Sequence, residues 1–109
     1  MSALNVFKTV TASITTTPTT VYTAPSNYTA IILMAQITNI TSTTGTVTFT
    51  HFDGTKTIHL LKDFAVPGND AVAATVGKLV LQQTQTVQVS ANANGTFELT
   101  LSILESANG

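Results

Sequence analysis

The sequence contains no cysteine and no tryptophan, and only 8% of its 109 residues are charged. Without cysteine, disulfides, thiolate metal sites and cysteine nucleophiles are excluded for this chain. The basic residues are all lysines (Lys8, Lys56, Lys62 and Lys78), and the net charge is −1. With so few basic residues, the sequence lacks the basic patch that binds nucleic acid or an anionic membrane. We therefore expect neither of them as a partner.

Long apolar runs are also missing. The longest, Ala30–Ala35, is about a third of the length that spans a bilayer as a helix. The first ten residues lack the basic and apolar regions of a secretory signal. Threonine, by contrast, makes up about one residue in five, and it alternates with valine, isoleucine, phenylalanine and leucine. This alternation favours strands with one polar face.

A period of two dominates the sequence, and no stretch of eleven or more residues has a helical stripe. Turn residues separate the alternating segments at the spacing of a sandwich or barrel. We therefore expect an all-β protein: a single-domain antiparallel β-sandwich over residues 1–109, jelly-roll or immunoglobulin-like. Ala71–Val76 is unassigned and has room for one helical turn. About eight strands are predicted: Asn5–Ile14, Thr20–Thr23, Tyr28–Asn39, Gly45–Phe52, Thr55–Leu61, Lys78–Leu81, Gln85–Ala91 and Thr96–Leu104.

The first turn with a defined geometry is Asp53-Gly54. Both residues suit a two-residue type I′ loop, whose central positions need positive φ. That loop pairs Phe49 with Ile58 and Val47 with Leu60. It predicts that all four apolar side chains lie on the core face.

A second hairpin is predicted near the C-terminal end. A three-residue loop, Ala93–Gly95 with Gly95 in the left-handed conformation, pairs Val89 with Leu99. A two-residue loop would split the apolar residues between the two faces. We favour the longer loop because burying several more apolar side chains, at about 1.5–3 kcal/mol each, outweighs a turn preference.

The segment Tyr28–Asn39 is apolar on both faces. Such a strand is covered on both sides within the domain, or it covers a partner. We favour a subunit interface on the non-core face, with a central position in the sandwich as the alternative. The predicted core parity holds Ile31, Leu33, Ala35 and Ile37. The predicted interface parity holds Ile32, Met34 and Gln36.

Residues 1–10 are predicted to form either an edge strand or an N-terminal arm that reaches a neighbour. Chain starts are usually loose unless they dock. Here the candidate docking contacts are Leu4, Val6 and Phe7.

No arrangement of residues predicts catalysis or metal binding. The expected hairpin register puts His51 and His59 on opposite faces, so they cannot share an ion. Glu98 points outward and Glu105 lies at a frayed strand end, so two carboxylates do not meet in one cleft. Serine-nucleophile and phosphate-loop motifs are absent. We expect no catalytic residue, no metal and no cofactor, and therefore no enzyme.

Two stretches carry a resemblance to a known family. The first comprises Val21–Pro25, Thr29–Leu33 and Ile37–Asn39, and it resembles the opening of small β-sandwich modules in virion proteins of tailed bacteriophages. The second comprises Gly77–Leu81, Thr86–Ala91 and Leu99–Glu105, and it is similar to the C-terminal half of small structural proteins of cyanobacterial phages. The sequence departs from that pattern at Gln82–Gln85, where such modules often carry acidic residues.

The resemblance implies a non-enzymatic component of a phage virion. A capsid decoration (cement) protein that stabilises the head lattice is the favoured role. The alternative is a tail, baseplate or head–tail junction protein, and a further alternative is a carbohydrate-binding module. The expected partners are the major capsid protein or other virion proteins and further copies of the chain, assembled in the host cytoplasm. A homotrimer is favoured because icosahedral heads offer three-fold and quasi-three-fold positions.

Overall fold

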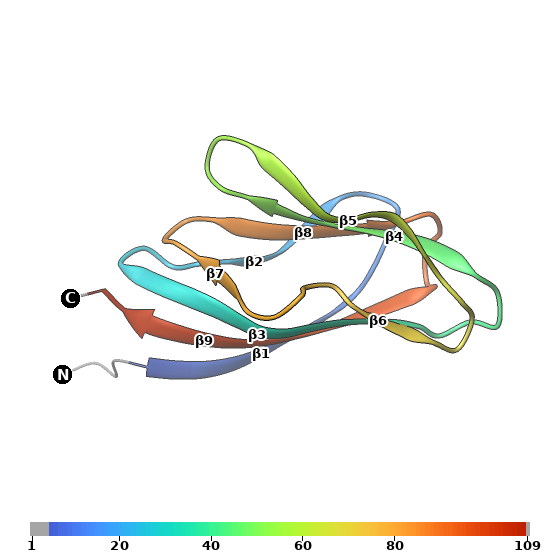
Figure 1. Ribbon diagram of the computed structural model, residues 1–109, viewed down its shortest axis with the longest axis horizontal. Coiled ribbons are helices and arrows are strands. Elements are labelled where there is room, and N and C mark those ends of the chain that lie inside the picture. The colour runs from blue at the N-terminus through green and yellow to red at the C-terminus, as the bar shows by residue number, and fades with distance from the viewer. Residues whose placement is uncertain (1–4, 109) are drawn as a thin grey trace.

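The computed structural model describes residues 5–108, which form nine β-strands (Figure 1). All pairings between strands are antiparallel, which confirms the expected all-β antiparallel sandwich. None of the described residues belongs to a helix of the length and apolar character that crossing a membrane requires. The strands are β1 (Asn5–Ser13), β2 (Thr19–Thr23), β3 (Tyr28–Asn39), β4 (Gly45–Phe52), β5 (Thr57–Val66), β6 (Ala71–Ala73), β7 (Leu79–Leu81), β8 (Thr86–Ala91) and β9 (Phe97–Ala107).

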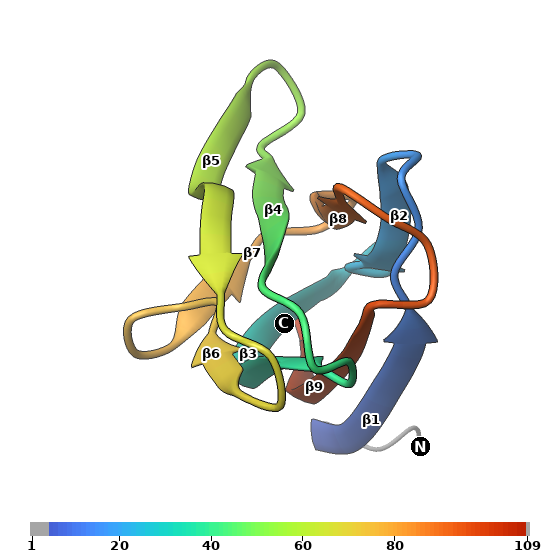
Figure 2. The same cartoon turned by 90° about the vertical axis from the view of Figure 1, so that its right-hand side faces the viewer.

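The strands form two sheets that face each other (Figure 2). One sheet has the order β1-β9-β3-β6, with β7 also paired to β3, and the other has the order β2-β8-β4-β5. When β6 and β7 are taken as one interrupted strand, the first strand pairs with the last, the second with the next to last, and so on to the central β4–β5 hairpin. This is the topology of a jelly roll, the first of the two expected sandwich types.

The core lies between the sheets and is filled by every second side chain of the long strands. Alternation places these residues on one face of each strand. Each large apolar side chain buried there stabilises the fold by about 1.5–3 kcal/mol. The largest fully buried side chains are Phe49, Phe97, Ile14, Ile32, Ile37, Leu81, Leu99, Leu101, Ile103, Val47, Val66 and Val87.

The β4–β5 turn is longer than predicted. Phe52 pairs with Thr57, so the loop has four residues. The carboxylate of Asp53 explains this length, because it accepts the backbone N–H groups of Thr55 at 2.9 Å and Lys56 at 2.8 Å. The expected two-residue loop and its register are wrong, and Ile58 is 46% exposed instead of lying in the core.

The rest of that hairpin agrees in part with the prediction. Val47 and Phe49 are buried as predicted, and Leu60 is half-buried against the core. The register shifts on both sides of Phe49, so β5 does not follow β4 residue for residue.

The segments on either side of Gly95 do not form a hairpin. Gly95 has φ 72° and Val89 and Leu99 are buried, as predicted. However, β8 pairs with β2 and β4, whereas β9 pairs with β1 and β3 in the opposite sheet. Strands in opposite sheets turn their apolar faces toward the same core, so the alternation of apolar residues is the same in this arrangement as in a hairpin.

A register shift in β3 reverses the predicted faces of its first half. Ile32 pairs with Ile103 of β9, but the next β9 residue, Ser102, pairs with Met34. The extra residue is a β-bulge, which switches the parity of the strand. Ile32 is fully buried, so its predicted place on a surface interface is wrong, while Ala35 and Ile37 lie in the core as predicted.

Two smaller segments complete the architecture. Ala71–Ala73 forms the strand β6 on β3 instead of a helical turn. Residues from Asn5 onward form the edge strand β1 in continuous register with β9, which favours the edge-strand interpretation of the N-terminal segment. The predicted contact residue Leu4 lies outside the described residues.

Candidate assembly surface

The outer face of the β1-β9-β3-β7 sheet carries a row of apolar side chains. Phe7 pairs with Leu104, Leu104 with Ile31, and Ile31 with Val80, so the row crosses four strands. Directly paired residues of antiparallel strands point to the same face and contact one another. We call Phe7, Leu104, Ile31 and Val80 the apolar row. Phe7 is 75% exposed and Val80 52% exposed, and the other two are half-buried.

The bulge in β3 adds two more apolar side chains beside this row. Met34 is 39% exposed. Leu33 is half-buried and lines a hollow of about 200 Å³ together with Phe7 and Ser102. Exposed apolar surface that is contiguous in this way is typical of a protein–protein contact.

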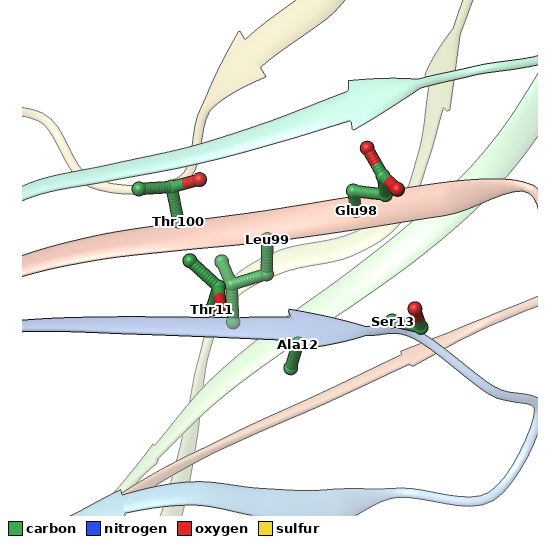
Figure 3. A pocket seen from close by; sticks show the side chains of 6 residues that line it. All are labelled: Thr11, Ala12, Ser13, Glu98, Leu99 and Thr100. Atoms are coloured by element: carbon green, nitrogen blue, oxygen red, sulfur yellow. The ribbon is translucent and has the colours of Figure 1, made fainter.

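The other half of the same face is polar. Its cross-strand rows run Thr11–Thr100–Gln36 and Ser13–Glu98–Thr38. A hollow of about 430 Å³ lies here on β1 and β9, and Figure 3 shows the side chains that line it. These are Thr11, Ala12, Ser13, Glu98, Leu99 and Thr100. The hydroxyl groups and the carboxylate of Glu98 can form hydrogen bonds there.

The predicted interface residues are partly brought together by the fold. Met34 and Gln36 are exposed on the outer face, as expected, whereas Ile32 is buried. Phe7, predicted as an N-terminal contact, belongs to the same face, and Val6 is half-buried on the inner side of β1.

Three members of the apolar row differ from the sequence prediction: Ile31 is predicted to lie in the core, and no prediction names Leu104 or Val80 as a contact residue. The signal was present in the consecutive apolar pairs Ile31-Ile32 and Ile103-Leu104. Two adjacent apolar residues in a strand point to opposite faces, so each pair places one side chain outside the core.

A buried carboxylate joins the two sheets near β1. Glu105 is 4% exposed and continues the inward face of β9, so its predicted place at a frayed end is wrong. The hydroxyl of Tyr22, on β2 of the other sheet, donates a hydrogen bond to its Oε2 at 2.5 Å. The Nζ of Lys8 lies 3.2 Å from its Oε1. A buried charge is tolerated only when it is paired in this way.

Alkaline pH is expected to destabilise the protein through Tyr22. Burial, then the hydrogen bond to Glu105 and its negative charge, raise the pKa of Tyr22 above the ordinary value of 10.0. The unfolded chain loses this proton near pH 10, but the folded chain retains it. The stability is therefore complete below that pH and is lost as the pH rises further. Urea unfolding at increasing pH measures this decline.

The variant Tyr22→Phe is expected to make the alkaline decline shallower. Tyr28→Phe leaves the contact between Tyr22 and Glu105 in place and is expected to retain the decline. Equal pH profiles for both variants would contradict the role of Tyr22.

The histidines lie on opposite faces of β4 and β5, as predicted. The Nε2 of His51 is 3.1 Å from the Oε1 of Gln85. His59 is exposed and pairs with Thr50, and both line a hollow of about 190 Å³ on the outer face of the second sheet. Among residues 5–108, no group of three or more histidine, aspartate or glutamate side chains is placed to hold a metal ion.

No protein-family model matches the sequence, and no curated protein matches it. Solved structures with similar folds are found at low identity. One is a protein of Bacillus endospore appendages, described as a novel family of disulfide-linked pili. It has a TM-score of 0.58 and 13% identity, and the match covers 96% of this chain and 88% of that one. This likeness shows the fold, while disulfide linkage is not available to a sequence without cysteine.

A pentameric capsid protein isolated from metagenomic phage sequences is also similar. Its TM-score is 0.46 and its identity is 17%, and the match covers 92% of this chain and 62% of that one.

Proposed function

We propose that this chain is a non-enzymatic structural subunit of a phage particle, a capsid decoration protein that binds the head lattice through the apolar row. The observation that carries the proposal is the row itself: four apolar side chains in register on the outer face of a sheet, two of them at least half exposed. Apolar surface of this kind is stabilised when a partner covers it.

Three further observations support a structural role. Residues 21–105 resemble virion proteins of tailed bacteriophages. The jelly roll is a common architecture of viral capsid domains, although a fold by itself does not define a function. Only 8% of the residues are charged. A surface with so little charge favours contact with other subunits over separation in solution.

The position of Tyr22 weakens the carbohydrate-binding alternative. A sugar site would need exposed aromatic rings for stacking. Tyr22, one of the two tyrosines in the sequence, is buried and hydrogen-bonded to Glu105. The tail or baseplate alternative uses the same fold and the same surface, so copy number must distinguish it from a decoration role.

Charge placed on the apolar row is expected to weaken binding to the particle. We expect Val80→Asp to bind at least about tenfold more weakly, equivalent to about 1.4 kcal/mol, because the carboxylate would be desolvated in the contact. Thr100→Asp, on the polar half of the same face, is the matched control and is expected to bind like the parent chain. Sedimentation of each variant with phage heads that lack the protein measures the bound fraction.

The number of copies in purified particles tests the location. A copy number that scales with the capsid subunits supports decoration of the head. A small number related to tail symmetry supports the tail alternative. Equal binding of Val80→Asp and Thr100→Asp, or absence of the protein from particles, would contradict the proposal.

The order of the oligomer is a separate part of the proposal. The three-fold positions of icosahedral heads favour a trimer. The long and regular edge strand β1 favours a twofold pair. The mass of the protein in concentrated solution distinguishes the two.

A further inference from the structure

The jelly roll leaves free strand edges on both sheets, and most of them carry features that discourage pairing. Short strands, bulges, proline and exposed charges are the usual protections of an edge. β2 has five residues, a register shift between Thr20 and Tyr22, and Pro18 just before it. β6 and β7 have three residues each.

The edge strand β5 is protected as well. Its register against β4 shifts on both sides of Phe49. Asp63 has φ 46°, a left-handed conformation that interrupts the extended backbone. Lys62 and Asp63 add exposed charges in the middle of the strand. A second chain would therefore find no regular backbone to pair with on β5.

The edge strand β1 lacks these protections. It has nine residues, and all nine pair with β9 from Asn5 to Ser13 without a shift. It contains no proline, and its only charge is that of Lys8, whose Nζ is held 3.2 Å from Glu105 of the same chain. Figures 1 and 2 show β1 at the margin of its sheet, with none of the described strands on its outer side. The outer edge of β1 is therefore a regular and nearly uncharged row of free backbone N–H and C=O groups.

We propose that β1 pairs antiparallel with β1 of a second copy, so that two five-stranded sheets become one continuous sheet. The inference rests on the proposed role as an assembling structural subunit and names the contact between copies. Among the strands of residues 5–108, β1 is the edge without these protections, so the matching edge on a second copy is the same strand. A twofold contact of this kind closes on itself and leaves no further β1 edge for continued growth.

The charge pattern of β1 fits a full-length overlap. In that register Thr9 lies opposite Thr9 of the second copy, and Lys8 lies opposite Val10. The two lysines are therefore not directly opposed, and each is neutralised by its own Glu105. Like charges directly across a strand pair would be destabilising.

The pairing also explains the position of Phe7. This ring is 75% exposed at the β1 end of the apolar row. In the full-length register it lies opposite Thr11 of the second copy, which covers part of the ring. The twofold axis is perpendicular to the sheet, so the apolar rows of both copies lie on one face. A pair would then engage a particle with two rows at once, which strengthens binding through effective concentration.

The contact is small for a stable dimer in dilute solution. The nine residues of β1, at about 3.4 Å each, give a contact that is about 30 Å long and only one strand wide. A standard interface is broader and buries about 800 Å² on each partner. Covalent trapping is therefore the suitable test, and the absence of cysteine from the sequence makes single-cysteine variants unambiguous.

Thr9→Cys is expected to form disulfide-linked dimers under mild oxidation. Directly paired residues of antiparallel strands have Cα atoms about 4.5–5.5 Å apart, within the range of about 4.4–6.8 Å that a disulfide spans. Ser13→Cys is the matched control, because it is exposed on the same strand and the same face but lies far from its counterpart. We expect dimers to form at least about tenfold faster with Thr9→Cys than with Ser13→Cys, measured by non-reducing electrophoresis at equal concentration.

A mixture of Phe7→Cys and Thr11→Cys provides an independent readout. The full-length register brings these two positions together between copies, so the mixture is expected to give mixed dimers faster than either variant alone. Equal rates for Thr9→Cys and Ser13→Cys, with no excess of mixed dimers, would overturn the pairing.

The failure of this inference is distinguishable from failure of the proposed function. Val80→Asp lies on β7, away from β1, so it is expected to lose particle binding while a Thr9→Cys chain that carries it still forms the disulfide. If the parent chain binds particles but the Thr9→Cys variant forms no linked dimer, the decoration role stands and the pairing is overturned. If the Thr9→Cys variant dimerises efficiently and the parent chain never binds a particle, the pairing stands and the decoration role is contradicted.

Discussion

Replacing Phe97 by alanine is expected to lower the free energy of unfolding by about 3–5 kcal/mol, the usual cost of removing a buried phenylalanine ring. Phe97 begins β9 and is fully buried. A Cβ built on Gly45 would lie 3.0 Å from its Cε2, so the ring packs directly over the backbone at the start of β4. Removing the ring leaves a cavity between the sheets, at the place where the chain crosses from one to the other.

Urea unfolding of the purified variant measures this effect. Phe7→Ala is the matched control, because Phe7 is 75% exposed on an outer face. A surface substitution of this kind is expected to change stability by no more than about 0.5 kcal/mol in the monomer. Similar losses for the two variants would show that Phe97 does not occupy the core.

Asn39→Asp is expected to cost about 3–5 kcal/mol, because it removes two donors from a buried network and adds a charge. Asn39 is fully buried at the end of β3. Its Nδ2 donates to the backbone carbonyls of Thr43 at 2.9 Å and Val66 at 3.0 Å. Its Oδ1 accepts from the N–H of Thr41 at 2.9 Å and the hydroxyl of Thr41 at 2.8 Å. A carboxylate can replace the acceptor but not the donors.

The control for this prediction is Asn94→Asp. Asn94 is exposed, and its Oδ1 accepts the N–H of Thr16 at 2.9 Å, a bond that a carboxylate keeps. Its effect is expected to stay within about 0.5 kcal/mol. Thermal unfolding of both variants at neutral pH measures the difference. A small effect at Asn39 would mean that the loop from residue 40 to 44 is held by other contacts.

The pattern of alternation predicted the interior well within single strands. Val47 and Phe49 on β4 and Val87 and Val89 on β8 are all buried, as their spacing indicates. Gly95 has a positive φ, which glycine adopts readily in a tight turn. These features depend on a few neighbouring residues, so local chemistry is sufficient to predict them.

Features that depend on the partner strand were predicted less well. The bulge at Leu33 and Met34 is defined by the register of β3 against β9, a strand that is distant along the chain. A one-residue shift exchanges the two faces of a strand, so Ile32 moved from the expected surface to the core, and Ile31 moved outward. The candidate surface was therefore placed on the correct strand but with two of its side chains exchanged.

The buried charge shows the same limit. Glu105 has the inward parity of Leu101 and Ile103, but a carboxylate is buried only if partners reach it. Those partners are Tyr22 on the opposite sheet and Lys8 on the neighbouring strand. Their approach is a property of the packed sheets, because β2 and β1 are distant from Glu105 in the sequence.

The sequence by itself determined the all-β class, the positions of most strands, the polar threonine faces and the presence of an apolar surface on the third strand. Alternation, turn residues and composition are local, and they suffice for these features. Only the tertiary structure decided that β8 and β9 lie in opposite sheets, that Phe7, Leu104, Ile31 and Val80 form one row, and that β1 is an unprotected edge. The reason is that alternation defines which side chains share a face, whereas the neighbours of a strand depend on pairing between distant segments.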